Sequence, residues 1–285
     1  MNGAARREQA PRIRAEPSES CDRVLAHAVA LAQAEWGERL VAAYALGSLA
    51  HGGFSPHVSD VDVGFVLADP LDDTDSETVM RITSGVRASG MPLGDRLSIF
   101  WGSPATLSGA ASGGRFPPLD IFDLKQFGRL LAGRDITPLV RSPTLRELIV
   151  STAGFALRVL STNEVMSLLR DPIRLANAET KRLTKLVLYP ARFLFTARTG
   201  QVGMNDRAVA HFTAVETGPV SDLLCKGLEW RFTPPHPGDR AVAELLGDGV
   251  LPLYRIFLAE YEQRLREYGE TELAQAYREW RERLV

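Results

Sequence analysis

The chain has 285 residues, 45% of them hydrophobic and 24% charged, a composition typical of a globular protein with one large or two modest domains. A formal net charge of −2 argues against general binding to nucleic acid or to an anionic membrane. Two distant cysteines exclude a disulfide framework, and no apolar run reaches the roughly 20 residues of a membrane span. We therefore predict a cytoplasmic protein with no membrane and no nucleic-acid partner.

The first part of the chain predicts a tail, a helix and a strand. Residues 1–18 are polar and include two prolines, so we expect this tail to be disordered. Ser18 or Ser20 could cap the helix that follows, in which apolar residues recur at helical spacing. Residues 40–46 are mostly apolar and predict the first strand.

The most informative stretch, residues 44–67, predicts a strand, a glycine-rich turn and a second strand. Successive side chains of a strand point to opposite faces, so Asp60 and Asp62 would share one face, with their Cα atoms about 6–7 Å apart. Two neighbouring carboxylates repel each other, and a divalent cation such as Mg²⁺ between them would relieve the repulsion. We therefore predict that Asp60 and Asp62 bind a metal and act in catalysis.

The turn between these strands has the residues of a phosphate-binding loop. Gly47 lets the backbone approach a phosphate closely, and the Ser48 hydroxyl could donate a hydrogen bond to it. The alternative is an ordinary β-hairpin whose two aspartates are solvated near its turn. The full array G-S … G-G-x-x-P-x-x-S-D-x-D is more specific than a D-x-D pair alone, and it favours phosphate and metal binding.

The rest of the first domain carries weaker signals. Ser76 could cap a helix to about residue 88, and residues 97–101 predict a third strand. Residues 102–114 are rich in Gly, Ser, Ala and Pro, which indicates a surface loop, either a lid over a substrate or a long connection. Residues 119–123 follow this loop, and the first domain ends near residue 140.

After about residue 143 the sequence predicts helices alone. Apolar residues recur at helical spacing in five segments: residues 145–160, 180–199, 205–212, 251–268 and 271–284. Pro190 should kink the second segment. The predicted fold class is α+β: a small α/β domain with a mixed sheet over residues 19–140, and an all-helical domain over residues 141–285. Ligands favour domain interfaces, so we expect the site in the cleft between them.

The stretch around Asp60 resembles the signature of the polymerase-β-like nucleotidyltransferases, and it is most similar to that of the aminoglycoside adenylyltransferases of the streptomycin and spectinomycin type. Those enzymes carry G-S-A-x-x-G-G-x-x-P-x-S-D-x-D, and this chain has one extra residue near Val58. The resemblance implies transfer of AMP from Mg-ATP to a hydroxyl of a small acceptor, possibly an aminoglycoside in antibiotic resistance, with release of pyrophosphate. It also implies that Gly47, Ser48 and Ser59 bind the nucleotide.

A second motif of this family supplies phosphate-binding charge, and here it is altered. The segment T-G-Q-V-G-M-N-D-R-A-V matches T-G-x-x-x-x-K-D-x-A, but Asn205 stands at the lysine position. Lys181, Lys185 and Arg192 on the preceding helix share one face and could supply the charge instead. We assign Lys185 and Arg192 to the triphosphate, and Arg192 also matches a family arginine. The alternative is a solvated stripe of basic residues.

Such sites usually contain a third carboxylate, which completes a metal site or takes the proton from the attacking hydroxyl. In the aminoglycoside enzymes a glutamate on the third strand is expected, and its position falls on Ser98, which cannot act as a base or as a charged ligand. Asp95, three residues earlier, is our candidate for the third catalytic carboxylate. Asp120 and Asp123 follow the loop, and they could contribute from a neighbouring strand.

Two other functions remain open. One is transfer of AMP to a protein, as minimal nucleotidyltransferase antitoxins do. The other is a degenerate nucleotide-binding protein without turnover, which Ser98 and Asn205 suggest. The sequence does not fix the acceptor, the preferred base or the oligomeric state.

Overall fold

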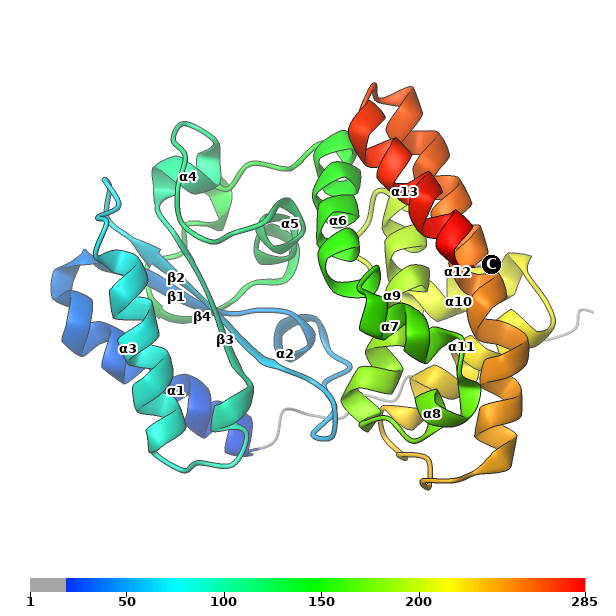
Figure 1. Cartoon of the computed structure of the whole chain (residues 1–285). Helices are drawn as coiled ribbons and strands as arrows, with labels where there is room; N and C mark the ends of the chain where they lie inside the picture. The colour runs from blue at the N-terminus through cyan, green and yellow to red at the C-terminus, as the bar shows by residue number, and fades with distance from the viewer. Residues whose placement is uncertain (1–18, 285) are drawn as a thin grey trace, which may run out of the picture.

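The computed structural model describes residues 19–284, which form two halves lying side by side (Figure 1). We call residues 19–140 the sheet half and residues 141–284 the helical half. The predicted disorder of residues 1–18 concerns a segment outside the described residues. The two halves combine a mixed four-stranded sheet with a large number of helices, so the predicted α+β fold class is confirmed.

The sheet half is built on four strands in the order β3-β2-β1-β4. The strands are β1 (Leu40–Ala45), β2 (Val61–Leu67), β3 (Leu97–Gly102) and β4 (Arg129–Gly133). β1 pairs antiparallel with β2 and β4, whereas β2 and β3 are parallel. On the central strand β2, Val61, Val63 and Phe65 are fully buried, as the alternation predicts. Asp62 therefore projects from the opposite face.

Two helices cover the face of the sheet on which these apolar residues lie (Figure 1). They are α1 (Glu19–Trp36) and α3 (Asp75–Ala88), which 3₁₀ turns at Gly37–Arg39 and Gly94–Arg96 join to the strands that follow. The apolar face predicted for α1 is buried against the sheet. The Asp75 carboxylate ties the two helices together, because it accepts a hydrogen bond from Nε1 of Trp36 at 2.9 Å.

The other face of the sheet is covered by α4 (Pro104–Ser108), α5 (Pro118–Phe127) and the 3₁₀ turn Thr137–Leu139. α4 lies inside the segment predicted as a loop, where Ser103 caps it and accepts a hydrogen bond from the backbone N–H of Thr106. α5 includes residues 119–123, for which we considered a strand. The sequence Pro117–Pro118 accounts for the difference, because proline favours the first turn of a helix.

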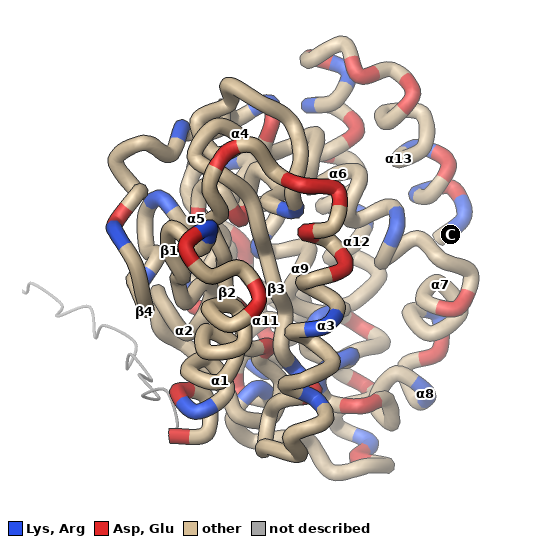
Figure 2. Tube along the Cα trace, turned by 90° about the vertical axis from the view of Figure 1, so that its left-hand side faces the viewer, with Lys and Arg blue, Asp and Glu red and all other residues tan. Residues whose placement is uncertain are grey.

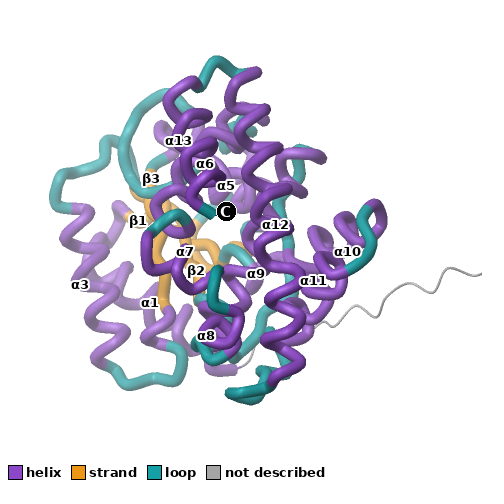
Figure 3. The backbone as a smooth tube through the Cα atoms, turned by 45° about the vertical axis from the view of Figure 1, so that its right-hand side comes forward, coloured by secondary structure: helices purple, strands orange, loops and turns teal. Residues whose placement is uncertain are grey.

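The helical half is packed around α9, as Figure 3 shows. Its helices are α6 (Leu145–Leu160), α7 (Asn163–Leu169), α8 (Pro172–Ala176), α9 (Thr180–Thr199), α10 (Asn205–Val215), α11 (Pro219–Trp230), α12 (Arg240–Glu267) and α13 (Thr271–Arg283). Pro190 lies inside α9, which continues past it, and the kink stays a prediction. An aromatic cluster joins α12 to α13, where the ring of Phe257 lies 5.8 Å from that of Tyr277 and 6.0 Å from that of Trp280.

Several helix boundaries differ from the predicted ones. A short helix, α2 (Ser48–His51), forms inside the predicted glycine-rich turn. α3 begins before Ser76, with Thr74 at its N-cap, so Ser76 does not cap this helix. α12 begins well before the predicted start, because Asp239 caps it and Pro252 is tolerated in its interior.

The hydropathy of the helices and the distribution of charged residues in the structure agree with what the composition predicts. None of the described helices is both long enough and apolar enough to cross a bilayer. Basic and acidic residues are interspersed along the trace in Figure 2, consistent with the net charge of −2. The cytoplasmic location stays a prediction.

Several contacts between described residues join the two halves, and two sets of them lie outside the acidic part of the cleft. Phe122 of α5 packs with Leu148 of α6 in a small apolar cluster. Elsewhere Arg231, which follows α11, donates a hydrogen bond to the carbonyl of Gly53 at 2.7 Å, and the Ser55 hydroxyl donates to the carbonyl of Arg231. These contacts fix the position of the β1–β2 connection relative to the helical half.

We predict that Glu147→Gln lowers the free energy of unfolding by about 1 kcal/mol. Glu147 closes a capping box at the start of α6, where its carboxylate accepts a hydrogen bond from the Thr144 N–H at 2.8 Å and pairs with Arg141 at 2.7 Å. The hydrogen bond from Arg141, together with those from Thr144, lowers the pKa of Glu147 to about 2. The stabilisation is therefore complete above the ordinary pKa of 4.5 and is lost as the pH falls through about 2.

Urea denaturation near neutral pH and near pH 3 measures this effect. The difference between the wild type and Glu147→Gln should shrink at the lower pH. Glu244→Gln is a matched control, because Glu244 is exposed on α12 and no described residue pairs with it. Equal differences at both pH values would contradict the prediction.

Candidate active site

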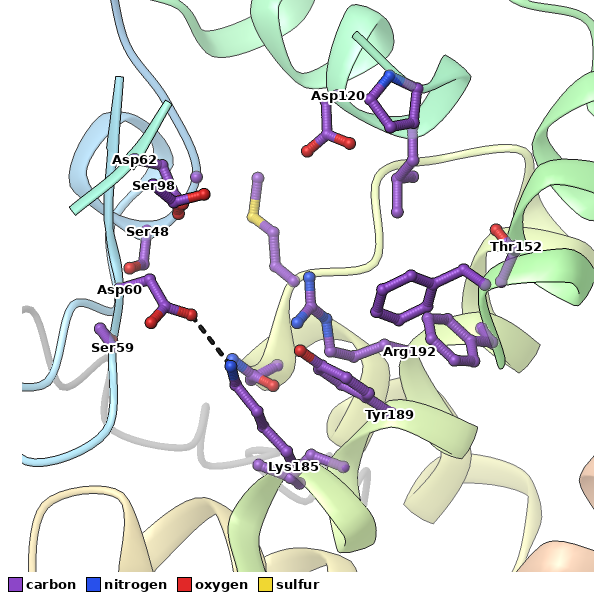
Figure 4. A pocket seen from close by; sticks show the side chains of 18 of the residues that line it. Ser48, Ser59, Asp60, Asp62, Ser98, Asp120, Thr152, Lys185, Tyr189 and Arg192 are labelled. Atoms are coloured by element: carbon purple, nitrogen blue, oxygen red, sulfur yellow. Dashed lines mark hydrogen bonds and ion pairs between the residues drawn. The ribbon is translucent and has the colours of Figure 1, made fainter. Parts of the chain in front are cut away.

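A cleft of about 580 Å³ lies between the sheet half and the helical half. The β1–β2 connection, β2, β3 and α5 form one side, and α6, α9 and the segments around Asn205 and Arg231 form the other. Figure 4 shows acidic residues of the sheet half facing Lys185, Tyr189 and Arg192 of α9. This cleft, in the place that the sequence predicts, is the candidate active site.

Asp60 and Asp62 both line the cleft. Asp62 lies on β2, and the parallel register places it beside Ser98 of β3. Asp60 directly precedes the strand, so the alternation of side chains carries both carboxylates to the cleft side while Val61 between them is fully buried. The two acids therefore lie on a shared face, as predicted.

Asp62 lies in the most acidic part of the cleft. Burial raises the pKa of the Asp62 carboxyl to about 8, and the charges of Asp60, Asp120 and Asp123 contribute to the rise, while Lys185 opposes it. Among the described residues no cluster of three or more side chains is arranged to hold a metal. A hard cation at Asp60 and Asp62 would therefore need phosphate oxygens and water as its other ligands, which is the usual environment of Mg²⁺.

Asp60 is neutralised by the helical half. Nζ of Lys181 lies 2.6 Å from one carboxylate oxygen, and Nζ of Lys185 lies 3.0 Å from the other. Burial acts to raise the pKa of Asp60, but the bonds to the two lysines outweigh it and hold the pKa below its ordinary value. Both lysines belong to α9 and are one turn apart, so Asp60 also holds the start of this helix against the sheet half.

Gly47 closes the turn next to Asp62. Its φ of +58° suits glycine, and a Cβ at this position would lie 2.7 Å from Oδ2 of Asp62. The Gly47 N–H donates a hydrogen bond to Asp123 at 2.7 Å, and the other oxygen of Asp123 lies 3.8 Å from Nε2 of His51. Ser48 lines the cleft beside Gly47. Both predicted turn residues are therefore next to the acids, although the Gly47 N–H already has a partner.

α9 presents a basic and aromatic face to the cleft. Lys185, Tyr189 and Arg192 are spaced by four and three residues, so they line the cleft together (Figure 4). The Arg192 guanidinium lies 5.5 Å from the centre of the Tyr189 ring, and its Nε donates a hydrogen bond to the carbonyl of Gly203. Lys181 lines an adjoining groove instead.

Asp95 does not reach the cleft, contrary to our expectation. It is exposed in the 3₁₀ turn that precedes β3, and it is not one of the lining residues. The register places Ser98 beside Asp62, whereas Asp95 lies in the 3₁₀ turn Gly94–Arg96, which ends before β3 begins at Leu97. Ser98 itself faces the cleft at the position where the family's glutamate is expected.

Arg231 is a cleft residue that the sequence analysis does not single out. It is 8% exposed, and its side chain donates hydrogen bonds to the Gly53 carbonyl at 2.7 Å and to the Ser59 hydroxyl at 3.3 Å. None of the described carboxylates forms an ion pair with it, and burial lowers its pKa to about 10. A buried guanidinium with no counter-ion is suited to an anionic ligand. Ser59, predicted to bind the nucleotide, lines the cleft and also positions Arg231.

α5 contributes two further carboxylates. Asp120, the third residue of the helix, lines the cleft, and its carboxylate projects into it (Figure 4). Burial raises the pKa of Asp120 to about 7, Asp123 adds to the rise, and Arg115 and Arg192 oppose it. Asp123 lies one turn later, is buried and accepts the hydrogen bond from Gly47, so it supports the turn.

Comparisons with known proteins bear on the fold. No family model matches the chain, and no curated protein matches its sequence. Among solved structures, spectinomycin adenyltransferase AAD(9) from Enterococcus faecialis, solved with ATP and spectinomycin, matches with a TM-score of 0.56 at 13% identity, over 79% of this chain and 97% of that chain. The chain has the fold of this adenyltransferase. The resemblance predicted from the sequence is therefore confirmed at the level of the fold.

We predict that Gly47→Ala abolishes nucleotide binding and lowers the melting temperature. The new Cβ would collide with Asp62, and the backbone conformation at Gly47 would cost about 1–3 kcal/mol for any other residue. Gly90→Ala is the matched control, because Gly90 also has a positive φ of +65° but no atom lies near its added Cβ. The control should lose stability and keep nucleotide binding, as measured with a fluorescent ATP analogue. Normal binding by Gly47→Ala would contradict the role of the turn.

We predict that Arg231→Met weakens ATP binding about tenfold or more, because a charge-assisted hydrogen bond contributes about 1.5 kcal/mol or more. Arg231→Lys should retain part of the affinity. Arg255→Met on the exposed side of α12 is the control and should bind ATP as the wild type does. Isothermal titration measures the affinity, and melting without ATP measures the loss of the contacts to Gly53 and Ser59. If Arg231→Met bound ATP with the affinity of the wild type, Arg231 would not contribute to nucleotide binding, and the prediction would be wrong.

Proposed function

We propose that the protein transfers AMP from ATP to a hydroxyl group of a small acceptor and releases pyrophosphate. The observation that carries this proposal is the pair Asp60 and Asp62, next to the Gly47–Ser48 turn and facing the cations of α9 across one cleft. Carboxylates on one wall suit a metal, and cations on the other suit the phosphates. The shared fold with an adenyltransferase solved with ATP and spectinomycin supports the proposal.

Asp60 and Asp62 would hold Mg²⁺. The residues fit such an ion, since two carboxylates share one face, and burial and the neighbouring acids raise the pKa of Asp62 although Lys185 opposes the rise. When bound, the ion would neutralise charge on the triphosphate and polarise the reacting phosphate.

The protein's own residues would bind and orient the triphosphate. Ser48 of the turn, Lys185 and Arg192 of α9, and Arg231 line the same cleft. Lys185 pairs with Asp60 in this structure, so it would move from Asp60 to a phosphate when the nucleotide binds. Positioning and charge neutralisation supply most of the rate enhancement in phosphoryl transfer, because the protein has little covalent chemistry to perform.

The acceptor would lie against α6, where Thr152 and Phe155 line the cleft. Arg115 and Arg158 line the cleft as well, and Asp120 faces it from α5. Because AAD(9) was solved with spectinomycin, aminoglycosides are the first acceptors to test. The two arginines favour acceptors with few positive charges, including neutral hydroxylated molecules, over strongly polycationic ones.

A second candidate is a nucleotide-binding protein without turnover. Ser98 and Asn205 both line the cleft, at the positions where a carboxylate and a lysine are expected in the aminoglycoside adenylyltransferases. A site that lacks both groups would keep its affinity for a nucleotide and lose its chemistry.

Pyrophosphate release from Mg-ATP, measured with a panel of aminoglycosides and neutral sugars, separates these functions. Release that depends on an added acceptor supports the proposed transfer. Radiolabelled AMP that appears on a protein would instead indicate a protein AMP-transferase. Nucleotide binding without release under any condition would leave the second candidate.

We predict that Asp62→Asn removes the Mg²⁺-dependent stabilisation by ATP without lowering the stability of the ligand-free protein. The pKa of Asp62 is raised to about 8, so its contribution is favourable below its ordinary pKa of 3.8 and is lost as the pH rises through about 8. The amide avoids that loss at neutral pH. ATP at about 100 times its Kd should stabilise the wild type by about 2.7 kcal/mol.

A thermal-shift titration with ATP, with and without Mg²⁺, measures both effects. Asp73→Asn is the control, because Asp73 is exposed in the turn before α3 and lies outside the cleft. It should respond to Mg-ATP as the wild type does. Equal stabilisation of the wild type and Asp62→Asn would count against metal binding at this residue.

A further inference from the structure

The reaction needs a base, and β3 does not provide one. Ser98 stands beside Asp62 on β3, and a serine hydroxyl does not accept a proton from an alcohol at neutral pH. The carboxylates that line the described part of the cleft are Asp60, Asp62 and Asp120. In the proposed function Asp60 and Asp62 would bind Mg²⁺. Asp120 is therefore the lining carboxylate that is left to act as the base.

Helix α5 holds Asp120 in a fixed position. Ile121 and Leu124 pack into the apolar layer against the sheet, and Phe122 packs toward α6. These three contacts on neighbouring positions fix the rotation of the helix about its axis. As a result Asp120 projects into the cleft from the side where α5 meets α6, with its carboxylate turned toward the open space that Asp62 also faces (Figure 4).

The Asp120 carboxylate is available to a ligand. Apart from its own backbone N–H, no described residue donates a hydrogen bond to it or forms an ion pair with it. The charged groups that face it are Asp62 on β2, Asp123 on its own helix, Arg115 before α5 and Arg192 on α9. Burial and Asp123 raise its pKa to about 7, which is a suitable value for a base that works near neutral pH.

We propose that Asp120 is the general base of the reaction, which accepts the proton of the acceptor hydroxyl from α5 in place of a carboxylate on β3. The inference rests on the proposed AMP transfer. It gives Asp120 a role apart from Asp60 and Asp62, the pair that would hold the metal in the proposed function. Asp123 is unsuited to the role, since it is buried and already bound to Gly47.

The Asp120 carboxylate takes the hydroxyl proton, and the electron pair of the O–H bond forms the new bond from the acceptor oxygen to the α-phosphorus. The bond from the α-phosphorus to the oxygen that bridges to the β-phosphate breaks, and its electron pair leaves with pyrophosphate. The products are the AMP ester of the acceptor and pyrophosphate, and Asp120 then releases the proton to solvent.

Asp120→Asn tests this role. We expect turnover to fall about 100-fold or more, which is the usual contribution of a general base, while stabilisation by Mg-ATP stays at the wild-type level. The wild-type kcat should rise with pH through a pKa near 7, since the base acts in its deprotonated form, and the variant should lack this rise. Asp73→Asn should keep both the turnover and the pH profile of the wild type.

The double variant Asp120→Asn/Ser98→Glu distinguishes the loss of a base from damage to the structure of the cleft. It returns a carboxylate to β3 beside Asp62, and its turnover should exceed that of Asp120→Asn alone. A wild-type rate and pH profile in Asp120→Asn would overturn the inference. Loss of Mg-ATP stabilisation together with turnover, without recovery in the double variant, would also overturn it. If the wild type transfers AMP to no acceptor, the proposed function fails as a whole, an outcome distinct from the other two.

Discussion

The concentration of negative charge around Asp62 is the constraint on which the rest of the cleft depends. Asp60, Asp62, Asp120 and Asp123 come from two separate segments of the sheet half. The charges of the other three raise the pKa of Asp62, and Asp123 raises that of Asp120. Buried acids of this kind are stable only with nearby cations or with raised pKa values, and both occur here. The sheet half has few cations of its own at this point, so the helical half must supply them.

α9 connects the site to the stability of the helical half. One face of the helix is part of the apolar core, and the other carries the lysines and the arginine that meet the acids. A change in the packing of α9 would therefore move the charges that neutralise Asp60. The hydrogen bonds between Arg231 and the segment near Gly53 likewise serve both the cleft and the packing of the two halves.

The predicted residues that the structure brings to the cleft from the sheet half lie close together along the chain. Asp60, Asp62, Gly47 and Ser48 belong to one stretch, so strand alternation and turn chemistry suffice to place them. Lys185 could be found because helical spacing relates it to its neighbours on α9. The fold class followed from the change of periodicity, from strands to helices, near the middle of the chain.

Other placements could not be predicted from the sequence, because they depend on how distant segments pack together. Arg231 follows an ordinary amphipathic helix, and only the packing of α11 against the β1–β2 connection brings it to the acids. Asp95 is close to Ser98 in sequence, but it lies in the exposed 3₁₀ turn before β3 and does not line the cleft. Asp120 lies on a helix whose orientation is set by apolar contacts on two sides, which no local pattern reveals.

The pairing of Asp60 with two lysines has a consequence for the order in which ligands load. Each oxygen of this carboxylate already faces an ammonium group, so a free divalent ion must compete with two positive charges for it. In the proposed transfer from Mg-ATP, a triphosphate would offer the lysines other anionic partners and would so release the carboxylate to the ion. Each ligand would then strengthen the affinity for the other by the same factor, as thermodynamic linkage requires. Without nucleotide, Mg²⁺ would bind Asp60 weakly, because the ammonium groups of Lys181 and Lys185 already neutralise this carboxylate. The two lysines would thus take the place of the ion until the nucleotide binds.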